Sequence, residues 1–271
     1  MSLAREAGVS AEDAVVVHNS NKLAVRIRPS DVLARVAVAG QHVAGLEVAI
    51  ASTVAARGAP VARLDPRLER RVYHRDRFAV TFWTYYHAQR SGPSPASYAD
   101  ALHRLHAGMW GLDLDVPDFR ERIAEAHQVV VDRDASPELT GADRALLART
   151  LSETGTAIGR RASPNQLLHG EPHPGNVLNI ASGPVFIDFE TCCRGPVEFD
   201  AAHVPEKVAA RYPALDVQLL GECRRLVLAM VAAWRWQIGD EFPDGRRHGQ
   251  AILAILRGGP PWPTLGALDP G

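Results

Sequence analysis

The sequence predicts an α+β fold with a small β-rich N-terminal lobe and a larger, mainly helical C-terminal lobe. Short β-prone runs separated by turn residues fill the segment 15–38. After residue 91, apolar side chains recur every three to four residues, which is typical of helices. A short β-hairpin is expected near residue 180. Strands and helices are thus expected in largely separate parts of the chain.

The N-terminal lobe, including an inter-lobe strand, is expected to span residues 1–86. Leu46, Ile50 and Val54 recur every four residues, which predicts an amphipathic helix that ends before Gly58. An antiparallel meander is expected before this helix, and a further pair of strands is expected after it. The runs that should form an antiparallel meander are 15–17, 23–27 and 32–36, and those that should form a later strand pair are 72–73 and 78–86.

The C-terminal lobe is expected to span residues 87–257, after the turn-rich segment 91–95. Apolar stripes at helical spacing predict three long helices within it. The Gly- and Pro-rich segment 258–271 is expected to be a loosely packed tail. The three stripes are Tyr98, Leu102, Leu105 and Met109; Leu146, Leu147, Leu151 and Ile158; and Leu220, Cys223, Val227, Met230 and Trp234.

Composition excludes several classes of function. The chain has 271 residues, 46% of them hydrophobic, which is enough to bury a large core. Its formal net charge of -1 and the lack of a sustained basic run argue against nucleic acid or an anionic membrane as a partner. The absence of a membrane-length apolar run and of a signal pattern predicts a cytoplasmic protein. The three cysteines, Cys192, Cys193 and Cys223, are expected to be buried small hydrophobes.

The residues with the clearest chemistry lie between His169 and Glu190. The β-prone runs 177–180 and 185–187, joined by turn residues, predict a hairpin. If the runs pair about that turn, Asn176 and Asp188 fall opposite each other, with Cα atoms about 4.5 to 5.5 Å apart. One amide and one carboxylate oxygen suit Mg²⁺, which leaves part of its coordination shell for phosphates. With Glu171 as a proton acceptor on the preceding loop, the segment is equipped for phosphoryl transfer.

This segment resembles the catalytic loop and metal-binding segment of the aminoglycoside phosphotransferase and choline kinase family, which has a protein-kinase-like fold. Family members usually read His-Gly-Asp, four residues and Asn, followed by a strand that ends in Ile-Asp-Phe. His169, Gly170, Asn176 and Asp188 match this pattern, whereas Glu171 stands where the family has a catalytic aspartate. The resemblance implies a small-molecule phosphotransferase that uses Mg²⁺ with ATP or GTP and acts on a hydroxylated acceptor, with Glu171, Asn176 and Asp188 as catalytic residues.

Other segments between about residues 15 and 240 resemble the family more loosely. Arg35 is in the place of the strand cation that contacts the phosphates, and Glu47 resembles the helix glutamate that pairs with it. His169 and Asp200 would support the catalytic loop, although Asp200 could equally be a helix N-cap. The turn 18–22 takes the place of the phosphate-covering loop, yet it contains no glycine. The residues whose backbone would read the purine edge are Phe82, Trp83, Thr84 and Tyr85.

Alternatives to this function remain open at this point. Because Glu171 replaces the usual aspartate, the chain could bind nucleotide with weak or no phosphotransfer. His169, Glu171 and His173 could instead hold Zn²⁺ or Fe²⁺ on one face of a strand, but the two intervening prolines argue against a paired strand there. Sugars, amino alcohols and antibiotics, which would imply antibiotic resistance, are all possible acceptors. The acidic residues that would suit a cationic antibiotic are Glu198, Glu206, Glu241 and Asp244.

Overall fold

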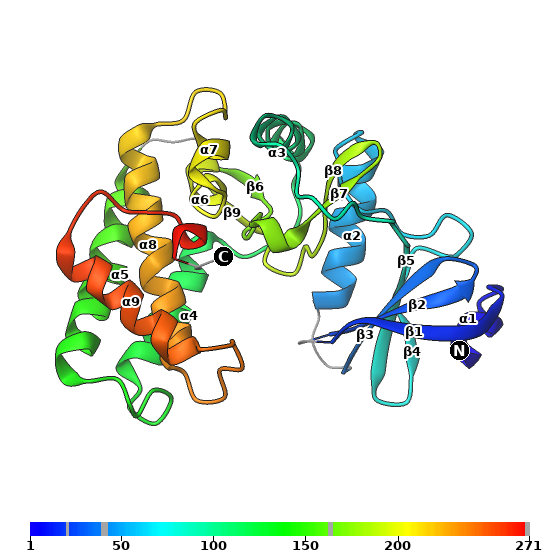
Figure 1. Ribbon diagram of the computed structural model, residues 1–271, viewed down its shortest axis with the longest axis horizontal. Coiled ribbons are helices and arrows are strands. Elements are labelled where there is room, and N and C mark those ends of the chain that lie inside the picture. The colour runs from blue at the N-terminus through cyan, green and yellow to red at the C-terminus, as the bar shows by residue number, and fades with distance from the viewer. Residues whose placement is uncertain (20–21, 39–42, 162–164, 269–271) are drawn as a thin grey trace. The chain divides into compact units, whose positions relative to one another are not determined.

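The computed structural model describes residues 1–19, 22–38, 43–161 and 165–268 (Figure 1). Packing divides the chain into two compact units. Unit 1 comprises Met1–Trp110 and Gly175–Thr191, and unit 2 comprises Gly111–Pro174 and Cys192–Gly271. A five-stranded sheet dominates unit 1 and helices dominate unit 2. The predicted α+β fold is therefore confirmed.

The sheet of unit 1 is antiparallel, with strand order β1-β2-β3-β5-β4. The predicted meander and the later strand pair are both present, although β1 begins four residues earlier than expected. Arg35 lies opposite Ala24 on one side and Thr81 on the other. Its strand is thus held between two others. The strands are β1 (Ala11–Asn19), β2 (Leu23–Pro29), β3 (Val32–Val38), β4 (Tyr73–Arg75) and β5 (Phe78–Thr84).

Alternation along β3 gives the sheet two different faces. Val32 and Ala34 are buried in a hydrophobic core that also holds Phe82 and Tyr73, whose rings lie 5.1 Å apart. Because successive strand residues point to opposite faces, Arg35 is directed away from this core. Helix α2 (Val43–Ala56) buries Ile50 and Val54, as its four-residue spacing predicted, whereas Leu46 is only half-buried and the charged Glu47 is buried. A short helix, α1 (Ser2–Glu6), precedes the sheet.

The predicted hairpin consists of β7 (Val177–Ile180) and β8 (Gly183–Phe186), after the 3₁₀ turn η1 (Pro174–Asn176). The Phe186 amide donates to the Pro60 carbonyl at 2.8 Å, and its carbonyl accepts from the Ala62 amide at 2.8 Å. The Phe186 ring also packs against Tyr98 of α3 (Pro95–Met109) at 6.0 Å. These contacts attach the hairpin and α3 to unit 1, although both lie beyond the lobe limit expected at residue 86. The lobe limits themselves stay a prediction.

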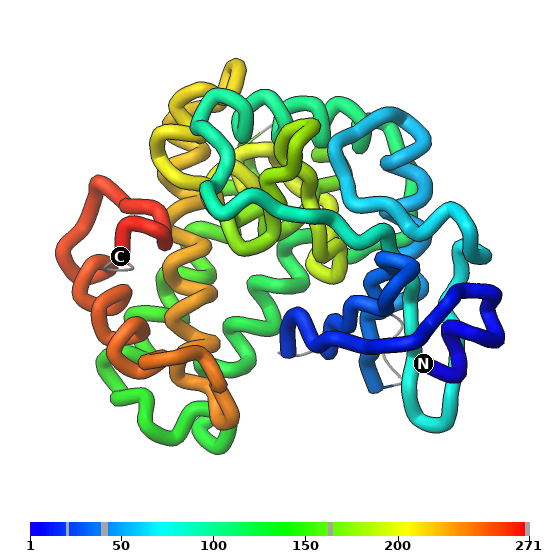
Figure 2. Tube along the Cα trace, turned by 45° about the vertical axis from the view of Figure 1, so that its right-hand side comes forward, coloured from blue at the N-terminus to red at the C-terminus, as the bar shows by residue number. Residues whose placement is uncertain are grey.

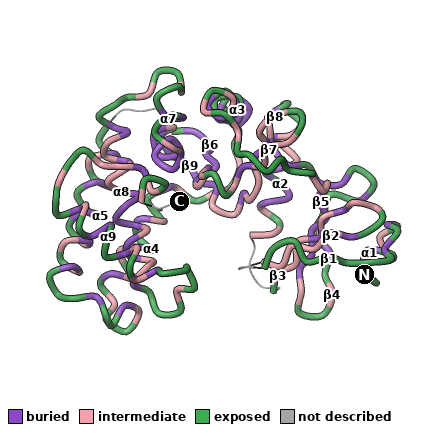
Figure 3. The backbone as a smooth tube through the Cα atoms, viewed as in Figure 1, coloured by how far each residue is buried: buried purple, intermediate pink, exposed green. Residues whose placement is uncertain are grey.

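Unit 2 is built around α8 (Val217–Trp236), whose buried face includes Leu226, Val227 and Met230 (Figure 3). Helices α4, α5 and α9 pack against α8, and α9 runs alongside it (Figure 2). The helices predicted at 98–109, 146–158 and 220–234 are all present. The remaining elements are α4 (Phe119–Val131), α5 (Gly141–Arg160), α6 (Val197–Ala201), α7 (Glu206–Ala209), α9 (Gly245–Gly258), β6 (Gln166–Leu168), β9 (Cys193–Gly195) and η2 (Leu265–Ala267).

Sequence reasoning missed α4 and α9. The start of α4 carries a readable signal, because Asp118 and Glu121 form a reciprocal capping box. Helix α9 begins at Gly245, and its N-cap residue Asp244 has a left-handed backbone and makes no side-chain capping hydrogen bond to a described residue. The segment expected to be a loose tail is partly packed, since Trp262 lies under the Arg225 guanidinium. Residues 269–271 of that tail are outside the described residues, as are Ser20 and Asn21 of the expected cover loop.

Two further expectations concern side chains and membranes. Cys192, Cys193 and Cys223 are buried and form no disulfide with any residue that the structure describes, and burial raises the pKa of the Cys193 thiol. They are the small buried hydrophobes that the sequence predicted. Among the helices that the structure describes, none has both the length and the apolar character needed to cross a bilayer.

Packing around α3 leads to a testable prediction. A Cβ atom at Gly108 would lie only 2.8 Å from the Ala59 Cβ. We expect Gly108→Ala to lower the free energy of unfolding by about 1 to 3 kcal/mol through overpacking. Of the residues that the structure describes, none comes within 4 Å of a Cβ built at Gly221 in α8, so Gly221→Ala should raise the free energy of unfolding by about 0.5 to 1 kcal/mol. Chemical denaturation of both variants measures the contrast, and equal effects would contradict the close approach.

Candidate active site

Unit 1 contains a cavity of about 510 Å³ between its sheet and its hairpin. Strand β3 contributes Leu33 and Arg35 to the wall, and the hairpin segment contributes Asn176 and Asp188. Much of the remaining wall is apolar or aromatic, which suits a flat organic ring next to a charged end. The other lining residues are Val17, His18, Lys22, Ala24, Ala62, Trp83, Thr84, Tyr85, Tyr86, Ala88, Gly175, Leu178, Ile187 and Glu190.

Asn176 and Asp188 border this cavity together, but they are not opposite each other in the hairpin. The Ile187 amide donates to the Asn176 carbonyl at 3.0 Å, so Ile187 is the partner of Asn176. The expected register was wrong by one residue because the turn contains only Ala181 and Ser182 and β8 begins at Gly183. Asp188 instead adopts a left-handed backbone, with φ of 67°, a conformation that aspartate tolerates better than most residues.

The Arg35 guanidinium joins the strand, the helix and the hairpin segment of unit 1. Its Nη1 lies 2.7 Å from Oε1 of Glu47, and its Nη2 lies 2.9 Å from Oδ1 of Asp188. Burial lowers the pKa of Arg35, but the carboxylates of Glu47 and Asp188 outweigh it and the net pKa is raised. The guanidinium is therefore charged and has its orientation fixed on two sides. The pairing of Arg35 with Glu47 is the arrangement that the family resemblance implied.

Lys22 and Glu190 complete this arrangement, and sequence reasoning assigned neither of them to the site. The Lys22 Nζ lies 2.7 Å from Oε2 of Glu47 and 2.5 Å from Oε2 of Glu190. Together with Arg35, Glu47 and Asp188, these two residues form a group of five charged side chains that we call the pocket charge network. The signals that could have found the two residues are the position of Glu190 two residues after Asp188 and the rarity of lysine in this chain. The network consists of Lys22, Arg35, Glu47, Asp188 and Glu190.

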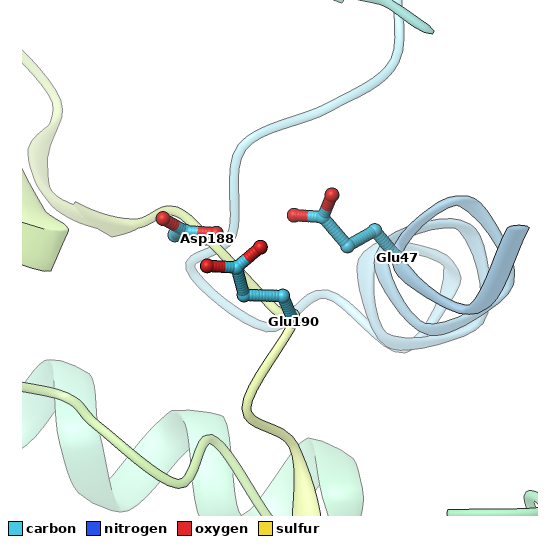
Figure 4. Close-up of side chains that lie close together, drawn as sticks. All are labelled: Glu47, Asp188 and Glu190. Atoms are coloured by element: carbon cyan, nitrogen blue, oxygen red, sulfur yellow. The ribbon is translucent and has the colours of Figure 1, made fainter. Parts of the chain in front are cut away.

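The carboxylates of the pocket charge network offer oxygen ligands for a divalent cation. Glu47, Asp188 and Glu190 each place one ligand atom within 4.8 Å of the others (Figure 4). Carboxylate oxygens, with the Asn176 amide on the same cavity, are the donor types that Mg²⁺ prefers. In the part of the chain that the structure describes, His169, Glu171 and His173 form no comparable group. The donor chemistry therefore fits magnesium in unit 1 better than zinc or iron at the histidines.

The segment expected to read a purine edge divides between the core and the cavity. Trp83, Thr84 and Tyr85 line the cavity, whereas Phe82 packs in the core. The Thr84 amide donates to the Arg63 carbonyl at 2.9 Å, and the Tyr85 amide donates to the Asp31 carbonyl at 3.2 Å. Backbone contacts from these two amides to a base would have to replace hydrogen bonds that already exist.

The loop that carries Glu171 belongs to unit 2 and is held by Asp200. The Asp200 carboxylate accepts from the His169 amide at 2.9 Å and from the Gly170 amide at 2.8 Å. Asp200 is fully buried and lies inside α6, whose N-cap position is Pro196. The N-cap alternative therefore does not fit, and the contacts match loop support. Gly170 has φ of 88°, which a side chain would disfavour.

The Glu171 carboxylate is paired with Arg122 of α4. Its Oε1 lies 2.5 Å from the Arg122 Nη2, and the two side chains are 24% and 12% exposed. Burial alone would raise the pKa of Glu171, but the Arg122 guanidinium outweighs it and the net pKa is lowered. The nearby His203 is fully buried, and burial lowers its pKa to about 4. Glu171 is thus ionised, and His203 neutral, at physiological pH.

Comparison with known proteins gives the family. The sequence matches the model of the APH phosphotransferase enzyme family over residues 4–236. The chain belongs to this family. Like the other members of the family, it is a phosphotransferase that depends on a nucleotide and phosphorylates small molecules. No curated protein sequence matches the chain significantly.

Solved structures show the same fold at low identity. An amicoumacin kinase bound to AMP-PNP and Ca²⁺ superposes with a TM-score of 0.74 at 11% identity, covering 96% of this chain and 93% of its own. An aminoglycoside phosphotransferase, APH(2")-IIia, bound to GDP and kanamycin, has a TM-score of 0.70 at 15% identity, covering 95% and 97%. A choline/ethanolamine kinase family protein from Mesorhizobium loti has a TM-score of 0.65 at 16% identity, covering 100% and 97%.

Two of the acidic residues considered for a cationic acceptor have structural partners in this phosphotransferase. Glu198 is buried and accepts from the Asp216 amide at 3.0 Å. Glu206 lies 2.8 Å from Arg224. Glu198 is therefore shielded from an acceptor by burial, and the charge of Glu206 is already paired with a cation. Glu241 and Asp244 are exposed in the segment before α9.

Arg122 of α4 is the partner of Glu171 that sequence reasoning missed, and this ion pair can be tested through stability. We expect Arg122→Met to lower the free energy of unfolding by about 3 kcal/mol, because it leaves a largely buried carboxylate without its cation. The double variant Arg122→Met/Glu171→Gln should recover most of that loss. Urea denaturation of the wild type, both single variants and the double variant measures the coupling.

The pH dependence of this stability has a definite sign. The pKa of Glu171 is lower in the folded protein than in the unfolded chain, where it is about 4.3. Its contribution is therefore fully present above that pH and disappears as the pH falls through the lower folded value. If, at pH 7, the loss of unfolding free energy in the double variant equals the sum of the losses in Arg122→Met and Glu171→Gln, the ion pair is contradicted.

Proposed function

We propose that this phosphotransferase moves the γ-phosphoryl group of ATP or GTP to a hydroxyl group of a small-molecule acceptor, with Mg²⁺ as cofactor. The observation that supports this most is the shared cavity of unit 1. It brings Asn176 and Asp188 to the wall that also carries Arg35, and Glu47 fixes the guanidinium from behind. Two oxygen donors for a metal and an oriented cation for phosphate are therefore within one cavity.

The residues of unit 1 would hold the nucleotide. Asn176 and Asp188 would hold Mg²⁺, which supplies neutralisation of the charge on the phosphate oxygens. The Asp188 carboxylate contacts Arg35, so engagement of Asp188 by a metal ion would leave one guanidinium nitrogen for a phosphate oxygen. Glu47 would keep the guanidinium in place. Leu33, Trp83 and the remaining apolar wall would enclose the purine ring.

Glu171 would serve the acceptor as general base. An ionised carboxylate can take the proton of the attacking hydroxyl as the new oxygen–phosphorus bond forms and the nucleoside diphosphate leaves. Arg122 would keep Glu171 ionised and hold its longer side chain in one position. Asp200 would hold the loop through the amides of His169 and Gly170.

A second function deserves a test because of the same ion pair. A carboxylate that is already bound by an arginine is a weaker base than a free one, which favours a nucleotide-binding protein with weak phosphotransfer. Acceptors related to the ligands and names of the similar structures, such as kanamycin, amicoumacin, choline and ethanolamine, form the first screening panel. Transfer to an antibiotic would support a role in antibiotic resistance. Nucleotide binding without transfer to any acceptor would favour the second function.

The proposed metal ligands give a direct prediction. We expect Asp188→Ala to lower kcat/KM by roughly 10³-fold or more, the scale on which charged groups act in phosphoryl transfer, and Asn176→Ala to lower it severely. Release of nucleoside diphosphate in a coupled assay measures both, with the most active acceptor of the panel. Asp100→Ala removes an exposed aspartate of α3 and should leave turnover unchanged. Near-normal turnover in Asp188→Ala would exclude the mechanism.

The role of Glu171 can be tested by pH. Because its pKa is lowered, the acidic limb of kcat/KM should lie below pH 4.3, the ordinary glutamate value, and Glu171→Gln should lose roughly 10²- to 10⁴-fold in rate. Arg122→Met should move the acidic limb to higher pH, since it removes the cation that lowers this pKa. Profiles measured over the pH range where both proteins stay folded decide this. An acidic limb at the same pH in both proteins would contradict the assignment.

A further inference from the structure

Lysine is rare in this chain, and one of the two lysines lies in the pocket charge network. The sequence contains 30 lysines and arginines together, of which only Lys22 and Lys207 are lysine. Lys22 lines the cavity of unit 1, and its side chain is only 10% exposed. Its ammonium group contacts two carboxylates, one on Glu47 and one on Glu190. Lys22 is therefore held at the charged end of the cavity rather than in solvent.

We propose that Lys22 is a second phosphate-binding cation of this phosphotransferase, which contacts the triphosphate beside Arg35, and that Glu190 helps to position it through their ion pair. The inference rests on the proposed function and extends it to residues that neither the sequence nor the family match assigned. The two cations are linked through one carboxylate, because Oε1 of Glu47 contacts Arg35 and Oε2 contacts Lys22. Glu47 thus places both cations side by side on the cavity wall.

The charge of the network favours this role. Counted as ionised, two cations face three carboxylates, which leaves one negative charge. A triphosphate alone would meet a network of the same sign. A divalent cation held by Asp188 would reverse that sign and would release Arg35 from Asp188. Lys22 and Arg35 would then both face the phosphates while Glu47 still orients them.

The chemistry of lysine suits this position. An ammonium group has three donors, so Lys22 can keep its contact with Glu47 and still donate to a phosphate oxygen. Its flexible stem allows it to leave Glu190 without a change of backbone. The segment His18 to Lys22 contains no glycine, so it lacks the residue that most easily lets a backbone approach a ligand closely. A side-chain cation would compensate for that.

A purely structural role is the competing explanation. Lys22 could serve only to neutralise the buried Glu47, which is 1% exposed. The two explanations differ in what a substitution does to different nucleotides. A structural lysine would affect adenosine and ATP equally, whereas a phosphate-binding lysine would affect only the phosphorylated ligands.

Calorimetric titration of the full chain with adenosine, ADP and ATP, with Mg²⁺ present, tests this difference. We expect Lys22→Met to weaken ATP binding by roughly ten- to a hundredfold, the effect of one hydrogen bond to a charged group. Adenosine binding should change less than about twofold. Lys22→Arg, which keeps the charge, should retain most of the affinity. The matched control is Lys207→Met, which removes an exposed lysine of unit 2 and should leave all three affinities unchanged.

The outcomes separate this inference from the proposed function. If the wild type binds none of the three ligands or their guanosine counterparts, the proposed function fails, and this inference fails with it. If the wild type binds ATP and Lys22→Met binds it equally well, or if adenosine and ATP weaken together, only the role of Lys22 is overturned.

A second measurement uses the wild type and does not depend on the folding of a variant. An acyl-phosphate derivative of ATP transfers its acyl group to a nearby lysine: the deprotonated amine forms an amide with the acyl carbon, and ATP leaves. We expect mass spectrometry to find Lys22 labelled and protected by excess MgATP, with any labelling of Lys207 unprotected. Labelling of Lys207 alone, or labelling of Lys22 that MgATP does not reduce, would overturn the proposal.

Discussion

The Arg35 guanidinium is the contact on which the site in unit 1 depends. It sits on a central strand, and its two terminal nitrogens contact carboxylates from α2 and from the segment after β8. Three segments far apart in the sequence therefore meet at one side chain. A largely buried cation with two charged partners has a strongly preferred position, because removing either partner leaves a charge that water reaches poorly. The position of Asp188, and through it the shape of the cavity, follows from that requirement.

Both units hold their key carboxylate with a partly buried arginine. In unit 1 Arg35 contacts Asp188, and in unit 2 Arg122 contacts Glu171 at 2.5 Å. The physical effect is the same in each case, since an adjacent guanidinium favours the ionised carboxylate. The consequences differ. Under the proposed function, Asp188 would exchange its arginine for a metal ion, whereas Glu171 would act as a base while its arginine is close.

Local chemistry made much of the fold predictable. Two elements have patterns that depend on neighbours in the chain, and both exist. One is helix α2, marked by the apolar spacing of Leu46, Ile50 and Val54, and the other is the hairpin, marked by the turn residues near 181. The register of the hairpin was not predictable at the level of one residue. Gly183 can belong either to the turn or to the strand, and contacts of Phe186 with Pro60 and Ala62 accompany the observed choice. Helix α4 was missed although Asp118 and Glu121 carry its capping signal.

The sequence by itself determined the class of chemistry, because the identity and spacing of Glu171, Asn176 and Asp188 are properties of one short segment. It also determined many of the strands and helices, since periodicity is local, although α4 and α9 were missed. Only the tertiary structure decided the partners: that Glu171 has Arg122, that Glu47 serves two cations, and that Lys22 belongs to the network. An ion pair between residues dozens of positions apart leaves no periodic trace in the sequence. Its energy depends on burial and distance, which the folded chain alone defines.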